Sequence, residues 1–367
     1  MKILLYILIF IPYWLTAQSA GDLKFEIERM ILNDTEISLS KTPGFLIGII
    51  DGENEHIVEF GTNGPKSEDV LNVGDIFEVG SISKVMTASL ISILEHKGLI
   101  QYNQKVNELL PLEYQNPRLE DLSIINLIQH HSSLPIRPYY FGKKNVDPDN
   151  PYRYYKKTDL LEFYRDFVPE KGERSNNFRY AHTNYALLEI ALEYFTETEY
   201  SILLKEHLLG PLHMDSTFVD FKEQREDVLT PGYDRAVRVA DPWLFSSFAA
   251  SEGIKANMTD LLSYTKAHMN ITETGLEEIL IENTNAELPT DFNQYIYTAR
   301  GWQVVKQRKR YNIITHTGKT GGHVAFIAFV KETKTGVVLL ANSATGAENL
   351  GFLILRMINY NWKRKTP

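Results

Sequence analysis

The segment from Ser81 to Glu95 constrains the fold most, because nearly every residue in it is apolar or small. A helix that is apolar on almost all sides must lie inside the protein, surrounded by other elements. Gly98 follows soon after and is typical of the end of a helix. Between Ser81 and Glu95, Lys84 is the only charged residue. A buried ammonium group is costly unless it has a partner or a task. The sequence therefore predicts a central helix that carries one functional lysine.

Ser81 and Lys84 stand three residues apart at the expected N-terminus of this helix. Residues at this spacing share a helix face, so the ammonium group can reach the Ser81 hydroxyl. The free N–H groups and the positive end of the helix dipole favour negative charge there. Nucleophilic serine catalysis needs such a hydroxyl, a basic nitrogen whose pKa is lowered by burial, and N–H donors. From these two residues alone, an N-cap serine followed by a snorkelling lysine remains an alternative.

Predicted strands cluster at the two ends of the chain. Residues 45–50 and 56–60 are apolar runs on either side of Asp51-Gly52, which is typical of a hairpin. Residues 323–330 and 336–341 are almost continuously apolar, as in strands covered on both faces. Helical patterns occur at residues 23–38 and 350–362, and residues 100–270 show mainly helices and polar loops. We therefore predict a sheet assembled from both termini, with a mostly helical region inserted between them.

The composition excludes several classes of function. With 367 residues, 43% of them hydrophobic, the chain can bury a substantial core in one large domain or two packed lobes. The formal charge of −9, without a basic stripe, makes nucleic acid an unsuitable partner. The absence of cysteine excludes disulfides, cysteine-ligated zinc and thiol nucleophiles. The histidines show no metal-ligand spacing, and we expect neither a metal nor a cofactor.

Residues 1–20 are typical of a secretory signal. Met1-Lys2 precedes an apolar run from Ile3 to Leu15, and small and polar residues follow up to Ala20. The run is short for a membrane span, although a retained N-terminal anchor is the alternative. No other segment is long and apolar enough to span a bilayer. We therefore expect a periplasmic or secreted protein whose mature chain begins near residue 21.

Phe77-Glu-Val-Gly-Ser-Ile-Ser-Lys84 resembles the nucleophile segment of the serine β-lactamase and penicillin-binding protein superfamily, in its class C-like branch. Other segments resemble motifs of this family in the same order. They are Leu127-Ile-Gln-His-His-Ser-Ser-Leu-Pro135, Tyr180-Ala-His-Thr-Asn-Tyr-Ala-Leu-Leu188, Pro211-Leu-His-Met214, Gly301-Trp302 and His316-Thr-Gly318. The matches extend from about Gly44 to Asn342.

The resemblance implies a fold of the α/β class. This fold is a three-layer α-β-α sandwich with an antiparallel sheet built from both chain ends, plus an inserted, mostly helical subdomain. We expect residues 21–367 to form a single catalytic domain. Its α/β lobe is expected at about 21–100 and 270–367, and its helical subdomain at about 100–270.

The resemblance also implies roles for residues of the first two motifs. Ser81 is the expected nucleophile, Lys84 its activating base, and Tyr180 the residue that shuttles the proton during acylation and deacylation. His182 stands where the family has an asparagine, whose amide binds the substrate carbonyl and the lysine. A neutral imidazole cannot offer both hydrogen bonds in that geometry, so the substrate preference is open.

The third motif has two possible registers. Lys319-Thr320-Gly321 spells the family's lysine-threonine-glycine, but starting at His316 places Gly322 and the following strand at the usual distances. We therefore assign the motif to His316, Thr317 and Gly318, and we expect the N–H groups of Lys319 and Ser81 to form the oxyanion hole. With an ordinary pKa of about 6.5, His316 would become a cation below neutral pH and then bind a substrate carboxylate.

We expect a serine hydrolase that cleaves amide bonds of D-amino-acid peptides through an acyl-enzyme, as DD-carboxypeptidases and low-mass penicillin-binding proteins do. Its partner is then a small molecule or a peptide, such as a cell-wall stem peptide. A carboxylesterase and a class C-like β-lactamase are the enzymatic alternatives. A cell-envelope peptide-binding protein that keeps the fold without turnover is the alternative from another class.

Overall fold

The computed structural model describes residues 20–365, apart from 36, 39, 140, 142–146, 171–176, 220–227, 308–309 and 346–347. Of the predicted signal segment, only Ala20 belongs to this described part, as the first residue of α1. Within the described residues, no helix is both long and apolar enough to cross a membrane.

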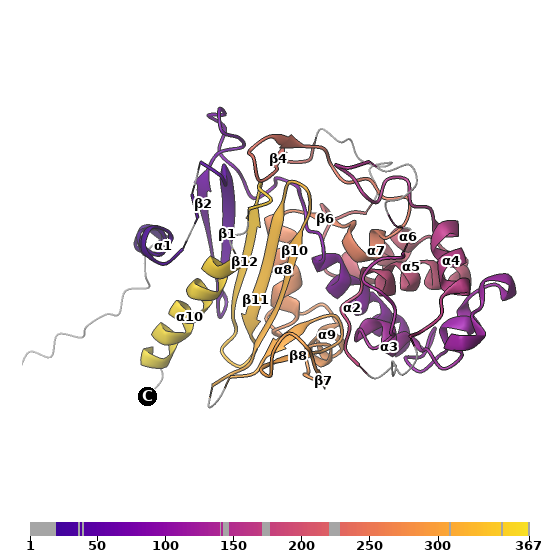
Figure 1. Ribbon diagram of the computed structural model, residues 1–367. Helices are drawn as coiled ribbons and strands as arrows, with labels where there is room; N and C mark the ends of the chain where they lie inside the picture. The colour runs from indigo at the N-terminus through magenta and orange to yellow at the C-terminus, as the bar shows by residue number, and fades with distance from the viewer. Residues whose placement is uncertain are drawn as a thin grey trace, which may run out of the picture.

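An antiparallel sheet of eight strands forms the centre of the molecule, in the order β2-β1-β12-β11-β10-β9-β8-β7 (Figure 1). Its strands are β1 (Gly44–Asp51), β2 (Asn54–Gly61), β7 (Leu288–Pro289), β8 (Ile296–Thr298), β9 (Gln303–Val305), β10 (Ile313–Lys319), β11 (Val324–Val330) and β12 (Thr335–Ala341). Strand β1 from the N-terminal part pairs with β12 from the C-terminal part. The predicted sheet from both chain ends and its β1–β2 hairpin are confirmed.

Helices cover both faces of this sheet (Figure 1). The α-helices are α1 (Ala20–Asp34), α2 (Ile82–His96), α3 (Ile124–Ile128), α4 (Lys157–Asp166), α5 (His182–Thr196), α6 (Tyr200–Leu204), α7 (Ala249–Glu252), α8 (Met258–Ala267), α9 (Glu277–Glu282) and α10 (Glu348–Lys365). Three short 3-10 helices are η1 (Val106–Leu109), η2 (Leu112–Tyr114) and η3 (Pro117–Leu119), and η4 (Lys205–Leu209) is a short π-helix. Helices α1 and α10 pack on one face, and α2 and α8 on the other.

Each face of the sheet has its own apolar core. Side chains such as Ile27, Phe326 and Ile354 form the core under α1 and α10. Residues such as Ile91, Leu262 and Leu340 belong to the larger core, which continues into the helical region. All seven residues of β11 are buried, as predicted for a strand that is covered on both faces. The three-layer α-β-α architecture is thus confirmed, whereas the expected lobe boundaries stay a prediction.

Helix α2 lies between the sheet and the helices α3 to α7 (Figure 1). It contacts β10 on one side and α7 on the other, and its residues from Ile82 to Leu94 are all buried. The predicted central helix is therefore confirmed. Ser81 immediately precedes it, and the Ser81 side chain makes no capping hydrogen bond to the helix backbone, so the hydroxyl is not used as an N-cap.

Two small sheets complete the fold. One consists of β4 (Gly232–Tyr233) and β5 (Val239–Ala240), and the other of β3 (Phe77–Glu78) and β6 (Lys255–Ala256). The pairing of β3 with β6 matters for the site, because β3 leads into α2 and β6 follows α7. It brings the end of α7 next to the start of α2, although about 170 residues separate them.

Candidate active site

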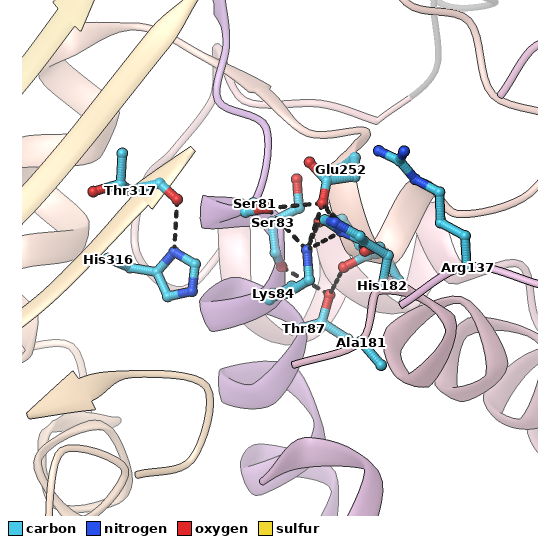
Figure 2. Close-up of polar contacts among 12 residues, drawn as sticks. Ser81, Ser83, Lys84, Thr87, Arg137, Ala181, His182, Glu252, His316 and Thr317 are labelled. Atoms are coloured by element: carbon cyan, nitrogen blue, oxygen red, sulfur yellow. Dashed lines mark hydrogen bonds and ion pairs between the residues drawn. The ribbon is translucent and has the colours of Figure 1, made fainter. Parts of the chain in front are cut away.

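Ser81 and Lys84 make the contact expected from their spacing. Lys84 Nζ donates a hydrogen bond of 3.0 Å to Ser81 Oγ. The Lys84 side chain is completely buried, and Ser81 retains 8% of its accessible surface. Figure 2 shows both side chains at the N-terminal end of α2, facing residues from α7 and from the start of α5.

Glu252 is the third member of this cluster, and the sequence analysis did not predict it. It is the last residue of α7, is 3% exposed, and accepts a hydrogen bond of 2.7 Å from Ser81 Oγ. The same oxygen, Oε1, lies 2.5 Å from Lys84 Nζ in a buried ion pair. Burial alone raises the pKa of Glu252, but the charge of Lys84 outweighs it and holds this pKa well below its usual range. Glu252 is therefore an anion beside the Ser81 hydroxyl.

His182 lies on the opposite side of Lys84 from His316 and completes the contacts of the ammonium group (Figure 2). Its Nδ1 is 3.1 Å from Lys84 Nζ and also contacts Glu252 Oε1. Burial and the charge of Lys84 lower the pKa of His182. A neutral imidazole with its proton on Nδ1 donates to the Glu252 carboxylate. His182 is therefore part of the Lys84–Glu252 cluster, as well as a residue of the pocket wall.

Tyr180 lies beside the cluster, but its contact differs from the expected one. Lys84 Nζ is 5.4 Å from the centre of the Tyr180 ring, and this ring packs on His130 and His182. Tyr180, Ser81 and Lys84 all belong to the described part of the chain, and no hydrogen bond joins the Tyr180 hydroxyl to either of the other two side chains. The expected role of Tyr180 in proton transfer stays a prediction.

His316 lies in β10 on the side of α2 away from Glu252 (Figure 2). It is 3% exposed, and its Nδ1 is 3.0 Å from the Thr317 carbonyl oxygen. Burial, together with the charge of Lys84, lowers the pKa of His316 to about 3. The imidazole is therefore neutral across the physiological range. The expectation that His316 becomes a cation just below pH 7 is wrong, because the sequence could not show its burial next to a lysine.

Gly318 and Gly80 bring the end of β10 against the start of α2. A Cβ at Gly318 would lie 1.8 Å from the Val79 carbonyl oxygen and 2.9 Å from the Ser81 nitrogen. Gly80 has a φ of +51°, and a Cβ there would lie 2.6 Å from the Lys319 nitrogen. Side chains at these positions would push the two backbones apart. The glycines therefore keep the Ser81 and Lys319 backbones close together, as an oxyanion hole requires, although that role stays a prediction.

Buried Glu78 holds the turn that follows β10. Its carboxylate accepts hydrogen bonds from the Trp243 backbone nitrogen at 2.6 Å and from Thr320 Oγ1 at 2.7 Å. It also lies 3.3 Å from His323 Nδ1. Burial alone raises the pKa of Glu78, but the hydrogen bond and charge of His323 outweigh it, so the net pKa is lowered. This carboxylate ties β3 to the turn after Lys319.

An open pocket of about 420 Å³ lies over Ser81 and Glu252. Its wall is formed by Ser81, Arg137, Tyr152, His182, Trp243, Glu252, Thr317, Lys319 and Glu348. Arg137 donates a hydrogen bond of 3.1 Å to the Tyr152 hydroxyl, and its buried Nε has no hydrogen-bond partner. No carboxylate among the described residues is paired with Arg137. The pocket therefore contains a cation that is free to bind an anionic group.

The sequence analysis missed Glu252 and Arg137. The only signal for Glu252 was a carboxylate within the otherwise small and apolar run from Phe248 to Ile254. Arg137 stands in a Pro-Ile-Arg-Pro sequence that gave no signal. Among the residues that the structure describes, no group of three or more histidine and acidic side chains is arranged to hold a metal ion.

Comparisons with known proteins identify the family of the chain. The family model described as beta-lactamase matches residues 32–357. A beta-lactamase of Psychrobacter immobilis is 23% identical over 338 residues, which cover 82% of this chain and 79% of that protein. A penicillin-binding protein of Bacillus subtilis is 24% identical over 300 residues, which cover 76% of this chain and 63% of that protein.

A solved structure has the same fold. The beta-lactamase/D-alanine carboxypeptidase of Pseudomonas syringae superposes with a TM-score of 0.77 at 16% sequence identity. The superposition covers 95% of this chain and 99% of that protein. At this level of identity, the likeness concerns the fold alone.

Proposed function

The chain belongs to the beta-lactamase family of serine hydrolases, and on that premise we propose that it cleaves amide bonds of D-amino-acid peptides through an acyl-enzyme. Ser81 is the proposed nucleophile because its hydroxyl lies in the pocket, within hydrogen-bond distance of both Lys84 and Glu252. This arrangement supports Ser81 as the group that attacks the substrate.

In the proposed reaction, Ser81 Oγ attacks the carbonyl carbon of the bound substrate. The N–H groups of Ser81 and Lys319 stabilise the oxyanion that develops, each contributing about 3 kcal/mol to lowering the barrier. Lys84 keeps a positive charge next to the nucleophile and orients its oxygen through the 3.0 Å hydrogen bond. Collapse of the oxyanion breaks the amide bond, and water then releases the acyl group from Ser81.

The observation that supports a peptide substrate with a free carboxylate is the guanidinium of Arg137 in the pocket wall, which pairs with no carboxylate among the described residues. The two lysines of the site already have carboxylate partners, since Lys84 contacts Glu252 and Lys319 contacts Glu348. His316 stays neutral. A carboxylate of the substrate is therefore best placed to bind Arg137, which stays charged at every physiological pH.

One of the relatives supports the same class of substrate. One relative in sequence is named a penicillin-binding protein. The signal-like residues 1–20 support secretion or a periplasmic location for this chain. A class C-like β-lactamase is the second candidate, because several relatives are named beta-lactamase.

The proposal is tested with four substrates: a peptide ending in D-alanyl-D-alanine, the same peptide with an amidated C-terminus, p-nitrophenyl acetate and nitrocefin. We expect release of D-alanine from the first peptide with a kcat/KM at least about tenfold above that for cleavage of the amidated one. Arg137→Gln should remove this preference and leave hydrolysis of p-nitrophenyl acetate within about threefold.

Turnover of nitrocefin without peptide cleavage would favour the β-lactamase instead. Turnover of p-nitrophenyl acetate alone would favour a carboxylesterase. A labelled Ser81 with no turnover of any of the four would favour the peptide-binding protein.

A further inference from the structure

We propose that Glu252 is the catalytic base that accepts the proton of Ser81 during acylation and the proton of the attacking water during deacylation. The proposal rests on the part of the proposed function in which Ser81 is the nucleophile. It does not depend on which substrate the enzyme cleaves.

The direction of the hydrogen bonds around Ser81 supports this role. Ser81 Oγ accepts a hydrogen bond from Lys84 Nζ and therefore points its own hydrogen toward another acceptor. That acceptor is Glu252 Oε1, at 2.7 Å. A general base must lie within hydrogen-bond reach of the proton that it removes, and Glu252 meets this condition.

Lys84 is occupied as a donor and is poorly placed to act as the base. Its Nζ donates to Ser81 Oγ, to the Ser251 carbonyl oxygen and to Glu252 Oε1. His182 Nδ1 also lies 3.1 Å from Nζ, but with its proton on Nδ1 this imidazole donates to Glu252 and accepts nothing from Lys84. An ammonium group has three N–H bonds, and these three acceptors use all of them. The nitrogen has no lone pair left for the Ser81 proton. Lys84 instead supplies the charge that keeps Glu252 ionised, while Glu252 supplies the lone pair.

The position of Tyr180 also favours Glu252 as the acceptor of the Ser81 proton. Lys84 faces the ring of Tyr180 from 5.4 Å, and no hydrogen bond between these described residues links the phenol to Ser81. Glu252 is also ready to act, because its 3% exposure keeps bulk water away and Lys84 and His182 hold it in place. Fixed charges in such a site need little rearrangement during the reaction.

The proton balance closes for both steps. In acylation, the Ser81 proton passes to Glu252 Oε1 as the Oγ–C bond forms, and Glu252 returns it to the leaving amine as the C–N bond breaks. In deacylation, Glu252 takes a proton from water as the new C–O bond forms. It then returns the proton to Ser81 Oγ as the acyl bond breaks, which regenerates the starting state.

The acylation role is tested by the rate at which a fluorophosphonate labels Ser81, read by mass spectrometry. Glu252→Gln keeps the size of the side chain but removes the base, and we expect labelling to slow by about 100-fold or more. Glu252→Asp keeps the charge beside Lys84 and hence the fold, but it withdraws the carboxylate from Ser81, so labelling should again slow at least tenfold.

Glu189→Gln is the matched control. Glu189 is also a buried carboxylate next to α7. It accepts a hydrogen bond from the Ala250 nitrogen and forms an ion pair with Lys157. It does not contact Ser81, so labelling at pH 7 should stay within about threefold of the wild type. Thermal melting of each variant shows whether it is folded. If Glu252→Gln does not fold, the labelling rate of Glu252→Asp alone tests the role of Glu252 as the base.

The deacylation role is tested with p-nitrophenyl acetate and hydroxylamine. In Glu252→Gln, an acetyl group should accumulate on Ser81, because water needs a base to attack it. Hydroxylamine is a strong nucleophile that needs no base, so it should release the acetyl group from wild type and variant at rates within about fivefold. If the substitution only disturbed the structure of the site, water and hydroxylamine would both attack the acetyl group more slowly, by similar factors.

Labelling of Glu252→Gln or Glu252→Asp at a rate within threefold of the wild type would overturn the proposal and leave Ser81 as the nucleophile. A wild type that fluorophosphonate does not label at Ser81 would contradict the serine hydrolase mechanism itself. Slow attack by both water and hydroxylamine would assign Glu252 a structural role only.

Discussion

The ammonium group of Lys319 forms an ion pair with Glu348 at the edge of the pocket. The backbone of Lys319, in contrast, lies against Gly80 at the start of the nucleophile segment. The side chain and the backbone of this residue therefore have separate tasks, and only the backbone is assigned to the oxyanion.

Lys319→Ala keeps the backbone N–H, so kcat/KM should fall by less than about tenfold. Gly318→Ala, in contrast, places a Cβ against the Val79 carbonyl oxygen and should lower kcat by about 100-fold or more, because the oxyanion donors shift. Steady-state kinetics with the substrate that the wild type cleaves best checks both variants. A larger loss in Lys319→Ala would mean that Lys319-Thr320-Gly321 is the working motif.

Ser81→Ala should abolish covalent labelling and lower turnover by several orders of magnitude, because it removes the nucleophilic oxygen. The fold should persist, since Ser81 precedes α2 and does not cap it. Intact-protein mass spectrometry after incubation with fluorophosphonate, together with a melting curve, checks this. Ser83→Ala is the control, because Ser83 Oγ accepts a hydrogen bond from the Ile254 nitrogen and lies outside the pocket wall. Labelling lost in the control alone would contradict the assignment.

Lys84→Arg should lose at least about 100-fold in kcat even though the charge remains. The guanidinium group is larger and planar, and a fully buried site filled by the Lys84 contacts has no room for it. Lys84→Met should lose activity as well and leave Glu252 as a buried carboxylate without its cationic partner, which destabilises the fold by about 3–5 kcal/mol. Kinetics and denaturant unfolding check these outcomes. Near-normal activity in the arginine variant would show that a positive charge alone suffices.

The preference for a free carboxylate should not depend on pH between 8 and 6. His316, with a pKa of about 3, remains neutral throughout this range, and Arg137 and the substrate carboxylate remain charged. Lys84 and Glu252 act on both substrates, so their effects cancel in the ratio of kcat/KM for the free and the amidated peptide. A ratio that rises on acidification in the wild type and flattens in His316→Asn would restore the carboxylate-binding role of His316.

Stability should fall as pH rises from about 4.5 to about 7 because of Glu189. Burial, partly offset by Lys157, raises the pKa of Glu189 from 4.5 to about 7. Between these values the folded state binds more protons than the unfolded state, so this carboxyl group stabilises the fold at low pH and loses that contribution toward pH 7. The loss amounts to at most about 3 kcal/mol. Urea unfolding at pH 5 and pH 8 should show a smaller difference in Glu189→Gln than in the wild type. Equal differences would contradict the shifted pKa.

The sequence was sufficient for the elements whose patterns are local. The apolar run after Ser81 predicted α2, because a helix without a polar face has to be buried. The apolar runs on either side of Asp51-Gly52 predicted the β1–β2 hairpin, and the apolar runs near the C-terminus predicted β11 and β12. The spacing of Ser81 and Lys84 predicted their hydrogen bond, because residues three apart meet on one helix face.

Only the tertiary structure decided which groups surround these two residues. Glu252 reaches Ser81 because β3 pairs with β6, across 171 positions of sequence that no local pattern spans. The neutrality of His316 likewise follows from burial beside Lys84, and burial depends on how distant elements pack. The sequence by itself determined the central helix with its serine–lysine pair and the strands of the framework, because these follow from short-range periodicity. The role of Ser81 as nucleophile stays a prediction that the family resemblance implies. The protonation states and the proposed base were decided by packing, since charges act through space and not along the chain.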